Sequence, residues 1–434
     1  MSLSATGNYR WRLVALLFVI GATNYGDRTA ISSVFPLLRS EFGASDVELA
    51  AIGTSFLWAY ALASPLAGSL ADRFSRSRII VISLVAWSLV TLVTGLANSL
   101  WQILASRVIL GFAEAAYLPA AIALIADYHA SDSRATAIGF HTAGLTFGLI
   151  AGGSAAGYLG EVYGWRATFL VLGVMGLALA AFAHFYLRDN RAAAVSGGEE
   201  TSATTASPLP FWQSAAILLT IPSYVIVLAE AMTVAIGTWI FLNWLPLFFK
   251  ETYNLSLAAA GFAGTFMLQG AATLGLIAGG YLSDWFAGQQ PRRRMLMQAV
   301  SYAIAAPFLL MFLVEPQLAL LNVCIFCFSF FQRMAACNET PLLCDLLAPH
   351  YRSTAIGMMN AANCLAGGMG IMLAGYLKAT YGLAGIFGGI SGLVVAGAAL
   401  TAVGYWRFLG RDLAERKTWN TPAVTAPTPV PTRA

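Results

Sequence analysis

Long apolar stretches separated by short polar connections are the dominant pattern along this chain of 434 residues. A helix that crosses a bilayer needs about 20 mainly apolar residues. The stretches long enough for a crossing cover residues 11–38, 48–71, 79–98, 101–127, 135–160, 166–187, 214–249, 254–283, 295–314, 317–347, 352–378 and 382–407. This pattern predicts an all-α membrane protein with twelve transmembrane helices. In the long seventh stretch, Pro222 is expected to start the crossing helix, because proline is favoured in a first helical turn.

Arginine residues collect in every second connection. They are Arg73, Arg76 and Arg78; Arg134; Arg188 and Arg191; Arg292, Arg293 and Arg294; and Arg352. Both ends of the chain are basic as well. Since cytoplasmic loops carry an excess of Lys and Arg, this bias predicts that both termini are cytoplasmic. The expected location is the cell membrane, meaning a plasma membrane or a bacterial inner membrane.

One connection, residues 188–212, is long, polar and rich in Gly, Ser, Thr and Ala, as flexible linkers are. It divides the chain into a six-helix half over residues 1–187 and a second half over 213–410. Residues 411–434 are expected to form a disordered tail.

The two halves are sequence repeats. Residues 134–169 align on residues 352–387 without gaps and share 14 of 36 positions, including Arg-x-Thr-Ala-Ile-Gly and Gly-Tyr-Leu. Parallel six-helix repeats are typical of alternating-access transporters, with a site between them near the middle of the membrane.

Composition restricts the function further. Hydrophobic residues make up 58% of the chain and charged residues 10%, against about 25% charged in an ordinary soluble domain. This balance excludes a soluble enzyme and a nucleic-acid-binding protein. The chain has no His-Glu-x-x-His, Gly-x-Ser-x-Gly or Walker pattern, so neither an enzyme nor a cofactor is expected. The five cysteines lie in apolar stretches without the spacing of a zinc site, and no metal is expected.

Seven charged residues fall inside the apolar stretches: Asp27, Arg28, Arg107, Glu114, Glu230, Arg333 and Glu339. A charge at the centre of a membrane helix costs about 2.5–3.5 kcal/mol on insertion scales, so such residues indicate a functional site. Arg107 and Glu114 are seven residues apart and share one helix face, whereas the neighbours Asp27 and Arg28 point about 100° apart. These four residues are expected to meet where the first and fourth spans face each other. A purely structural salt-bridge cluster is the alternative, and the roles of the other three residues stay open.

A motif in the connection after the second span points to a family. Gly68-Ser-Leu-Ala-Asp72-Arg73-Phe-Ser-Arg76-x-Arg78 resembles the loop motif of the major facilitator superfamily, and Gly280-Tyr-Leu-Ser-Asp284 stands at the corresponding place in the other half. The resemblance implies a twelve-helix transporter fold. It also implies that Gly68, Asp72, Arg73, Arg76, Gly280 and Asp284 act in gating, as a latch between helices.

Within that superfamily the chain resembles the anion:cation symporters. The matching segments are Asn24-Tyr25-Gly-Asp27-Arg28, Arg107-x3-Gly111-x2-Glu114-x4-Pro119, Asn243-Trp244-Leu-Pro246 and Gly357-x2-Asn360-x2-Asn363. The resemblance implies proton-coupled symport of a small organic anion. It implies Asp27 and Glu114 as proton sites, and it places Arg28, Arg107, Tyr25 and Tyr60 at the substrate. Asn360, Asn363 and His141 are further candidate substrate residues. Ordinary packing is the alternative for Tyr60, and a hydrogen-bonded helix residue is the alternative for His141. Gly144-Leu145 stand where sugar-acid members often carry an amide, which argues against a polyhydroxylated substrate.

Other interpretations remain. Glu114-Ala-x-Tyr117 and Ala126-Asp127 also resemble the Spinster-like transporters, which implies export of a lipid or amphiphile. A membrane sensor on a transporter-derived fold is a third possibility, and the retained acids argue against it. The expected partners are a small organic anion, protons and the bilayer. No nucleic acid is expected, and the protein is expected to be a monomer.

Overall fold

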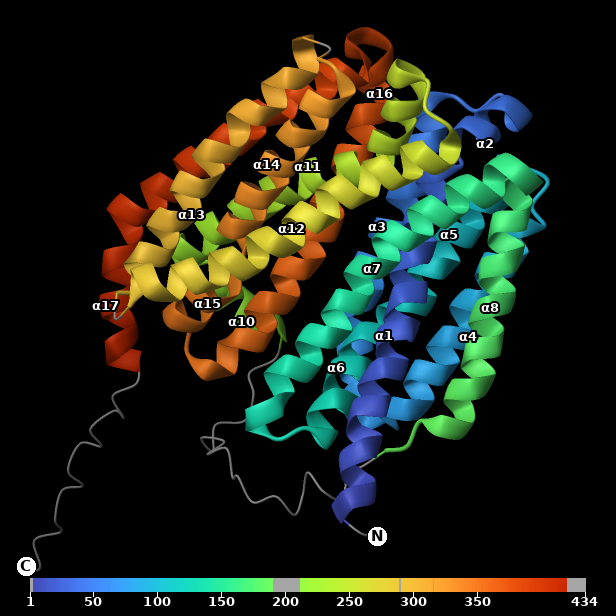
Figure 1. Cartoon of the computed structure of the whole chain (residues 1–434). Helices are drawn as coiled ribbons and strands as arrows, with labels where there is room; N and C mark the ends of the chain where they lie inside the picture. The colour runs from blue at the N-terminus through green and yellow to red at the C-terminus, as the bar shows by residue number, and fades with distance from the viewer. Residues whose placement is uncertain (1–2, 190–210, 289, 315, 420–434) are drawn as a thin grey trace, which may run out of the picture.

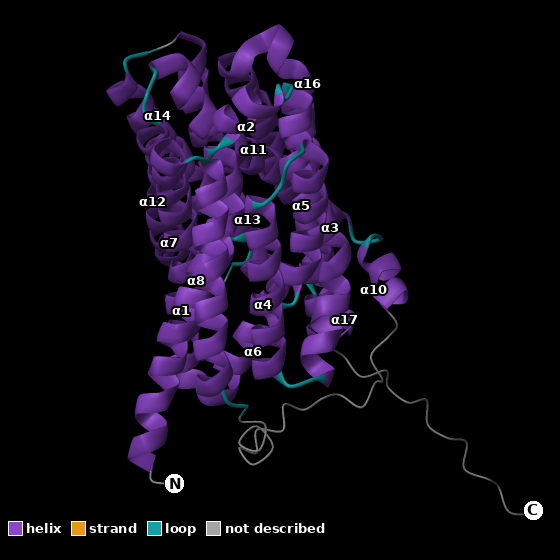
Figure 2. Cartoon of the chain, turned by 90° about the vertical axis from the view of Figure 1, so that its right-hand side faces the viewer, coloured by secondary structure: helices purple, strands orange, loops and turns teal. Residues whose placement is uncertain are grey.

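The computed structural model describes residues 3–189, 211–288, 290–314 and 316–419; it leaves the side chains of 3–8, 66–73, 131–132, 349–350 and 416–419 undescribed. All regular structure within these residues is helical (Figure 2). The helices are long and run roughly along one direction, with connections gathered at the two ends of the bundle. This is the arrangement expected of a chain that satisfies its backbone hydrogen bonds inside a bilayer.

Two groups of helices lie beside each other (Figure 1). The N-terminal helices are α1 (Leu3–Ser33), α2 (Phe35–Phe42), α3 (Asp46–Arg73), α4 (Arg76–Gly95), α5 (Leu100–Ala115), α6 (Tyr117–Tyr128), α7 (Ser131–Tyr163) and α8 (Trp165–Tyr186). The C-terminal helices are α10 (Phe211–Leu218), α11 (Pro222–Tyr253), α12 (Leu257–Ala287), α13 (Arg292–Ala305), the 3-10 helix η1 (Ala306–Val314), α14 (Leu318–Ala336), α15 (Glu339–Leu346), α16 (Pro349–Val403), the π-helix η2 (Gly404–Phe408) and α17 (Leu409–Trp419). Most of the predicted linker lies outside the described residues, so the domain boundaries stay a prediction.

The predicted twelve crossings are confirmed. Ten described segments are long and apolar enough to span a membrane, and the last of them, Tyr351–Glu415, has 65 residues. At 1.5 Å per residue that segment is about three times longer than the apolar core of a bilayer, so it contains two crossings. Gly382, at φ 63°, divides them inside α16. The remaining crossing is α1, whose apolar run is interrupted by Asn24, Asp27 and Arg28.

Three crossings that the pattern predicts as single helices divide into two α-helices, and the ninth continues from α13 into the 3-10 helix η1 at Ala306. The first divides into α1 and α2, the fourth into α5 and α6, and the tenth into α14 and α15. Pro36, Pro119 and Pro341 lie in the first turn of the second helix of each pair. A proline offers no amide hydrogen to the preceding turn and its ring clashes with that turn, so the helix restarts at each proline. By the same rule Pro222 begins α11, as predicted.

Close contact between α1 and α7 depends on glycines spaced four residues apart. Gly144, Gly148 and Gly152 face Phe18, Ala22 and Gly26 of α1 in turn. A Cβ on Gly152 would overlap the backbone of Gly26, so only glycine permits this approach. Without a hydrophobic force between helices in lipid, backbone contact of this kind is the main source of helix association.

Replacing Gly152 by valine is therefore expected to destabilise the bundle by about 1–3 kcal/mol, the usual cost of overpacking. Gly139→Val is the matched control, because it lies in the same helix and a Cβ there meets no atom within 4 Å. Thermal unfolding of both detergent-purified variants, followed by tryptophan fluorescence, measures the difference. Equal melting temperatures would show that the α1–α7 contact does not depend on glycine.

Candidate functional site

A cavity of about 360 Å³ lies between the N-terminal and the C-terminal helices. From the first group, α1, α3, α6 and α7 reach it; from the second group, α11, α12, α14, α15 and α16 do. Its polar lining residues are Tyr25, Arg28, Tyr60, Thr238, Gln269, Arg333, Glu339, Asn360 and Asn363. This volume falls in the range of small-molecule sites. Five of the predicted substrate residues, Tyr25, Arg28, Tyr60, Asn360 and Asn363, thus lie on one cavity wall or another.

Arg28 occupies the centre of the N-terminal wall. Its Nε donates a 2.9 Å hydrogen bond to Oε2 of Glu114, and the pair is almost fully buried. A second guanidinium nitrogen donates to Oδ1 of Asn24 at 3.3 Å. The rings of Tyr25 and Tyr60 flank the guanidinium at 4.2 and 4.7 Å. The first and fourth crossings therefore face each other as predicted, through a buried ion pair.

Gly111 explains why α5 brings Glu114 so close to the cavity. A Cβ on Gly111 would press against the carbonyl of Phe56 and the amide of Tyr60, both in α3. The glycine lets α5 and α3 approach at their backbones, one turn before Glu114. The spacing from Gly111 to Glu114 in the sequence thus has a packing reason as well as a chemical one.

Asp27 and Arg107 lie behind Arg28, away from the cavity wall. Asp27 accepts a 3.0 Å hydrogen bond from Thr91 on Oδ2, and the charges of Glu114 and Arg107 both act on it. The Arg107 guanidinium packs 4.8 Å from the ring centre of Phe56, and it makes no ion pair with any described carboxylate. Of the predicted four-residue cluster, only Arg28 is in a position to touch a ligand in the cavity.

Four buried carboxyl oxygens lack a hydrogen-bond partner among the described residues, and two of them belong to this site: Oδ1 of Asp27 and Oε1 of Glu114. A buried ionised oxygen without a hydrogen bond is expensive, and adding a proton to it removes most of that cost. Their role as proton sites stays a prediction.

His141 does not reach the cavity. It is fully buried, and its Nε2 forms a 2.9 Å hydrogen bond with the hydroxyl of Tyr117, which also contacts the carbonyl of Leu17. Together these contacts join α7 and α6 to α1. These contacts agree with the interpretation of His141 as a hydrogen-bonded helix residue. Neither His141 nor Arg107 is among the residues that line the cavity, and their roles at the substrate stay predictions. Gly144 likewise packs on α1 and does not face the ligand space, so its lack of an amide says nothing about the substrate.

The gating motif is described only in part. The side chains of Gly68, Asp72 and Arg73 lie outside the described residues. Arg76 pairs with Asp127, and Asp284 pairs with Arg294 at 2.8 Å. Both of these ion pairs stay within one group of helices, and a Cβ on Gly280 would meet nothing within 4 Å. A latch between the two groups at this end stays a prediction.

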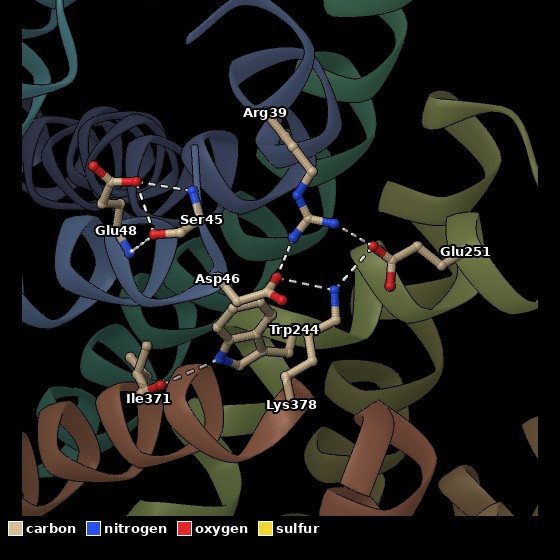
Figure 3. A network of polar contacts seen from close by, with 8 residues as sticks. All are labelled: Arg39, Ser45, Asp46, Glu48, Trp244, Glu251, Ile371 and Lys378. Carbon is tan, nitrogen blue, oxygen red and sulfur yellow. Dashed lines mark hydrogen bonds and ion pairs between the residues drawn. The ribbon is translucent and has the colours of Figure 1, made fainter. Parts of the chain in front are cut away.

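At the other end of the bundle, four charged residues join the two groups (Figure 3). Arg39 donates to Asp46 and, at 2.7 Å, to Glu251. Lys378 donates to the same two carboxylates at 3.0 and 2.9 Å. We call these four residues the clasp. The sequence pattern assigned them no role.

The two groups of helices pack backbone against backbone at the clasp end. There, Gly153 and Gly157 of α7 bring its backbone against Gly261 and Leu257 of α12. Toward the opposite end, a Cβ on Gly139 of α7 or on Gly357 of α16 would meet no atom within 4 Å. The two groups of ribbons accordingly diverge toward the lower end in Figure 1. The cavity is thus closed off at the clasp end by packing and by ion pairs.

Comparison with known families agrees with this architecture. The sequence profile of the Major Facilitator Superfamily matches residues 17–371, most of the chain. The chain therefore belongs to the Major Facilitator Superfamily, a superfamily of membrane transporters.

Individual relatives share about a quarter of their aligned residues with this chain. The chain is 27% identical to the probable L-galactonate transporter of Escherichia coli K12 over 62% of this chain and 60% of that protein. It is 26% identical to the probable galactarate/D-glucarate transporter GudP of Bacillus subtilis, over 63% of this chain and 65% of that protein. Each match thus spans less than two thirds of the relative's length. Protein spinster homolog 1 of Xenopus tropicalis is 26% identical over 82% of this chain and 70% of that protein.

A solved structure shows the same fold. It is the crystal structure of a bacterial homolog to the human lysosomal transporter Spinster, in an inward-facing and unoccupied conformation. The TM-score is 0.75 at 22% identity, covering 94% of this chain and 98% of that chain.

Neutralising the clasp is expected to open this end of the cavity. In a background whose only cysteine is Cys364, which lines the cavity, the double variant Arg39→Gln/Lys378→Gln should react faster with a membrane-impermeant thiol reagent added on the clasp side. We expect a rate increase of several-fold, because each base bridges the two helix groups. Arg166→Gln is the matched control, since it breaks an ion pair with Glu41 at the same end but within the N-terminal helices. Equal rates in all three proteins would mean that the clasp does not hold the two groups together.

Proposed function

We propose that this protein is a secondary transporter that carries a small organic anion together with protons. The carrying observation is the buried Arg28–Glu114 pair on the cavity wall, 2.9 Å from nitrogen to oxygen. An arginine at that position serves either its own carboxylate or a carboxylate of the substrate. The proton on Glu114 selects between the two.

The coupling follows from charge. When Glu114 is ionised, it holds Arg28 and a bound anion would have to displace it. When Glu114 takes a proton, it loses its charge, and the planar fork of Arg28 becomes available for two parallel hydrogen bonds to a substrate carboxylate. Asp27, behind the pair, is the second proton site. Tyr25 and Tyr60 hold the guanidinium in place through both states.

The orientation of the protein in the membrane follows from the arginine distribution. With both termini in the cytoplasm of a plasma or bacterial inner membrane, the clasp lies on the outer side and the structure is inward-facing. Breaking the clasp and closing the opposite end would turn the cavity outward. Inward proton movement then drives import of the anion by a monomer. The sugar-acid relatives support a carboxylate substrate, because their named substrates are carboxylates.

Transport of an amphiphile is the second candidate. The cavity wall carries Leu149, Val234, Ala235, Leu242 and Leu276 beside its charges. The Spinster relative matches more of the chain than the sugar-acid relatives do. Such a wall suits an acyl chain attached to an anionic head group.

Glu114→Gln is expected to retain substrate exchange and to lose accumulation driven by a proton gradient. The glutamine keeps the shape of the side chain but cannot change its charge. Proteoliposomes loaded with D-galactonate, galactarate, benzoate or a lysophospholipid identify the substrate by counterflow. The same vesicles with an imposed pH gradient then measure accumulation, which should fall about 10-fold or more.

Glu41→Gln, at the clasp end and away from the cavity, is the control and should accumulate substrate normally. A Glu114→Gln protein that concentrates substrate with an undiminished proton current would rule out Glu114 as a coupling site. Counterflow of the lysophospholipid alone would favour the amphiphile transporter.

A further inference from the structure

Arg333 is a second cation on the cavity wall, and it faces the cavity from the C-terminal helices. It lies one turn before the end of α14. It also lines an adjoining cavity of about 200 Å³ between α7 and α12, together with Tyr25, Thr146 and Gln269. Arg333 therefore stands where the two spaces meet, across from the wall that carries Arg28.

The guanidinium of Arg333 makes no ion pair within 4.0 Å with any described carboxylate. Glu339, on the same wall, acts on it only at longer range. In this respect it differs from Arg28, which Glu114 holds by a direct hydrogen bond. The Arg333 side chain is only partly buried, and none of its nitrogens is among the buried atoms that lack a partner, so the guanidinium is open to the cavity. A charge inside a membrane protein normally pairs with an anion. The open guanidinium therefore offers a site to an anion in the cavity.

The helix around Arg333 is held in place by other contacts. Gln332, its neighbour, donates a 3.0 Å hydrogen bond to the hydroxyl of Thr238 in α11. Ser329, one turn earlier, donates to the carbonyl of Leu268 in α12. These bonds fix α14 against both neighbours without using the guanidinium. Arg333 is therefore free to serve a ligand.

Besides its polar residues, the cavity wall carries apolar side chains, among them Leu149, Val234, Trp239 and Leu242. A ligand with one carboxylate would satisfy Arg28 and leave Arg333 unpaired. A ligand with a carboxylate at each end of a short carbon chain would satisfy both, and its carbon chain would pack on the apolar wall.

We propose that Arg333 is a second anion-binding residue and that the substrate is a dicarboxylate held between Arg28 and Arg333. This inference rests on the proposed function, because it names the substrate class of the same cavity. It assigns selectivity for charge to the C-terminal helices and proton coupling to the N-terminal helices. Arg333 then distinguishes dicarboxylates from monocarboxylates, and the Arg28–Glu114 pair couples binding to protons.

The test compares ligands of equal length that differ in one terminal group: succinate with butyrate, adipate with hexanoate, and galactarate with D-galactonate. Isothermal titration calorimetry on the purified full-length protein measures each affinity. The wild-type protein is expected to bind the dicarboxylate of the preferred pair about 10- to 100-fold more tightly, as a charge-assisted hydrogen bond implies. Arg333→Gln should reduce that ratio to about 1 while changing the affinity for the monocarboxylate little.

Two further variants separate a ligand contact from a structural role. Arg333→Lys keeps the charge without the planar fork, and an intermediate ratio is expected. Glu339→Gln removes the nearest acid, and the preference for the dicarboxylate should persist. If Arg333→Gln lowers both affinities equally, or if the wild-type protein does not distinguish the two members of any pair, the inference is wrong. If the wild-type protein binds none of these acids, the proposed anion transport itself fails.

Discussion

The buried ion pair between Arg28 and Glu114 is the interaction on which the site depends. It joins α1 to α5 in a region where an unpaired charge would be strongly unfavourable. Removing a partner from such a pair costs much more than the pair contributes, so each residue requires the other or a substitute for it. A substrate carboxylate can substitute for Glu114, and a proton can compensate Glu114. The same constraint that stabilises the resting site thus makes it responsive to ligand and proton.

Close helix packing makes this pair possible. Gly111 lets α5 approach α3, and Gly148 and Gly152 let α7 approach α1. The glycines therefore place Arg28, Glu114 and Tyr60 within reach of one another. Asp27 and Arg107 are not among the residues that line the cavity, so their charges act on the pair without touching a ligand there. Binding chemistry here follows from backbone distances between helices.

The clasp and the cavity lie at different depths of the bundle. The clasp links the two groups of helices, and the cavity lies between them. Arg39 and Lys378 bridge two carboxylates at one end, while the described ion pairs near the other end stay within a group. Ion pairs between the two groups break when the groups move apart. Ion pairs within one group are unaffected by a movement of one group relative to the other. This asymmetry gives the bundle one closed end.

Sequence alone determined the crossings, because a stretch of about 20 mainly apolar residues matches the thickness of the apolar core of a bilayer. It also determined the repeat, the superfamily and the residues whose charge is unusual at that depth. The breaks within crossings could have been predicted from the sequence, since a proline lies in the first turn after each of them. The length of the apolar stretches alone predicted single helices. Which charges meet could not be read from spacing: Arg107 and His141 carry the expected residue types yet face away from the cavity, and the clasp joins residues more than 300 positions apart, such as Asp46 and Lys378. Only the tertiary structure decided these contacts, because the direction of a side chain in a bundle depends on how each helix is rotated and packed against its neighbours.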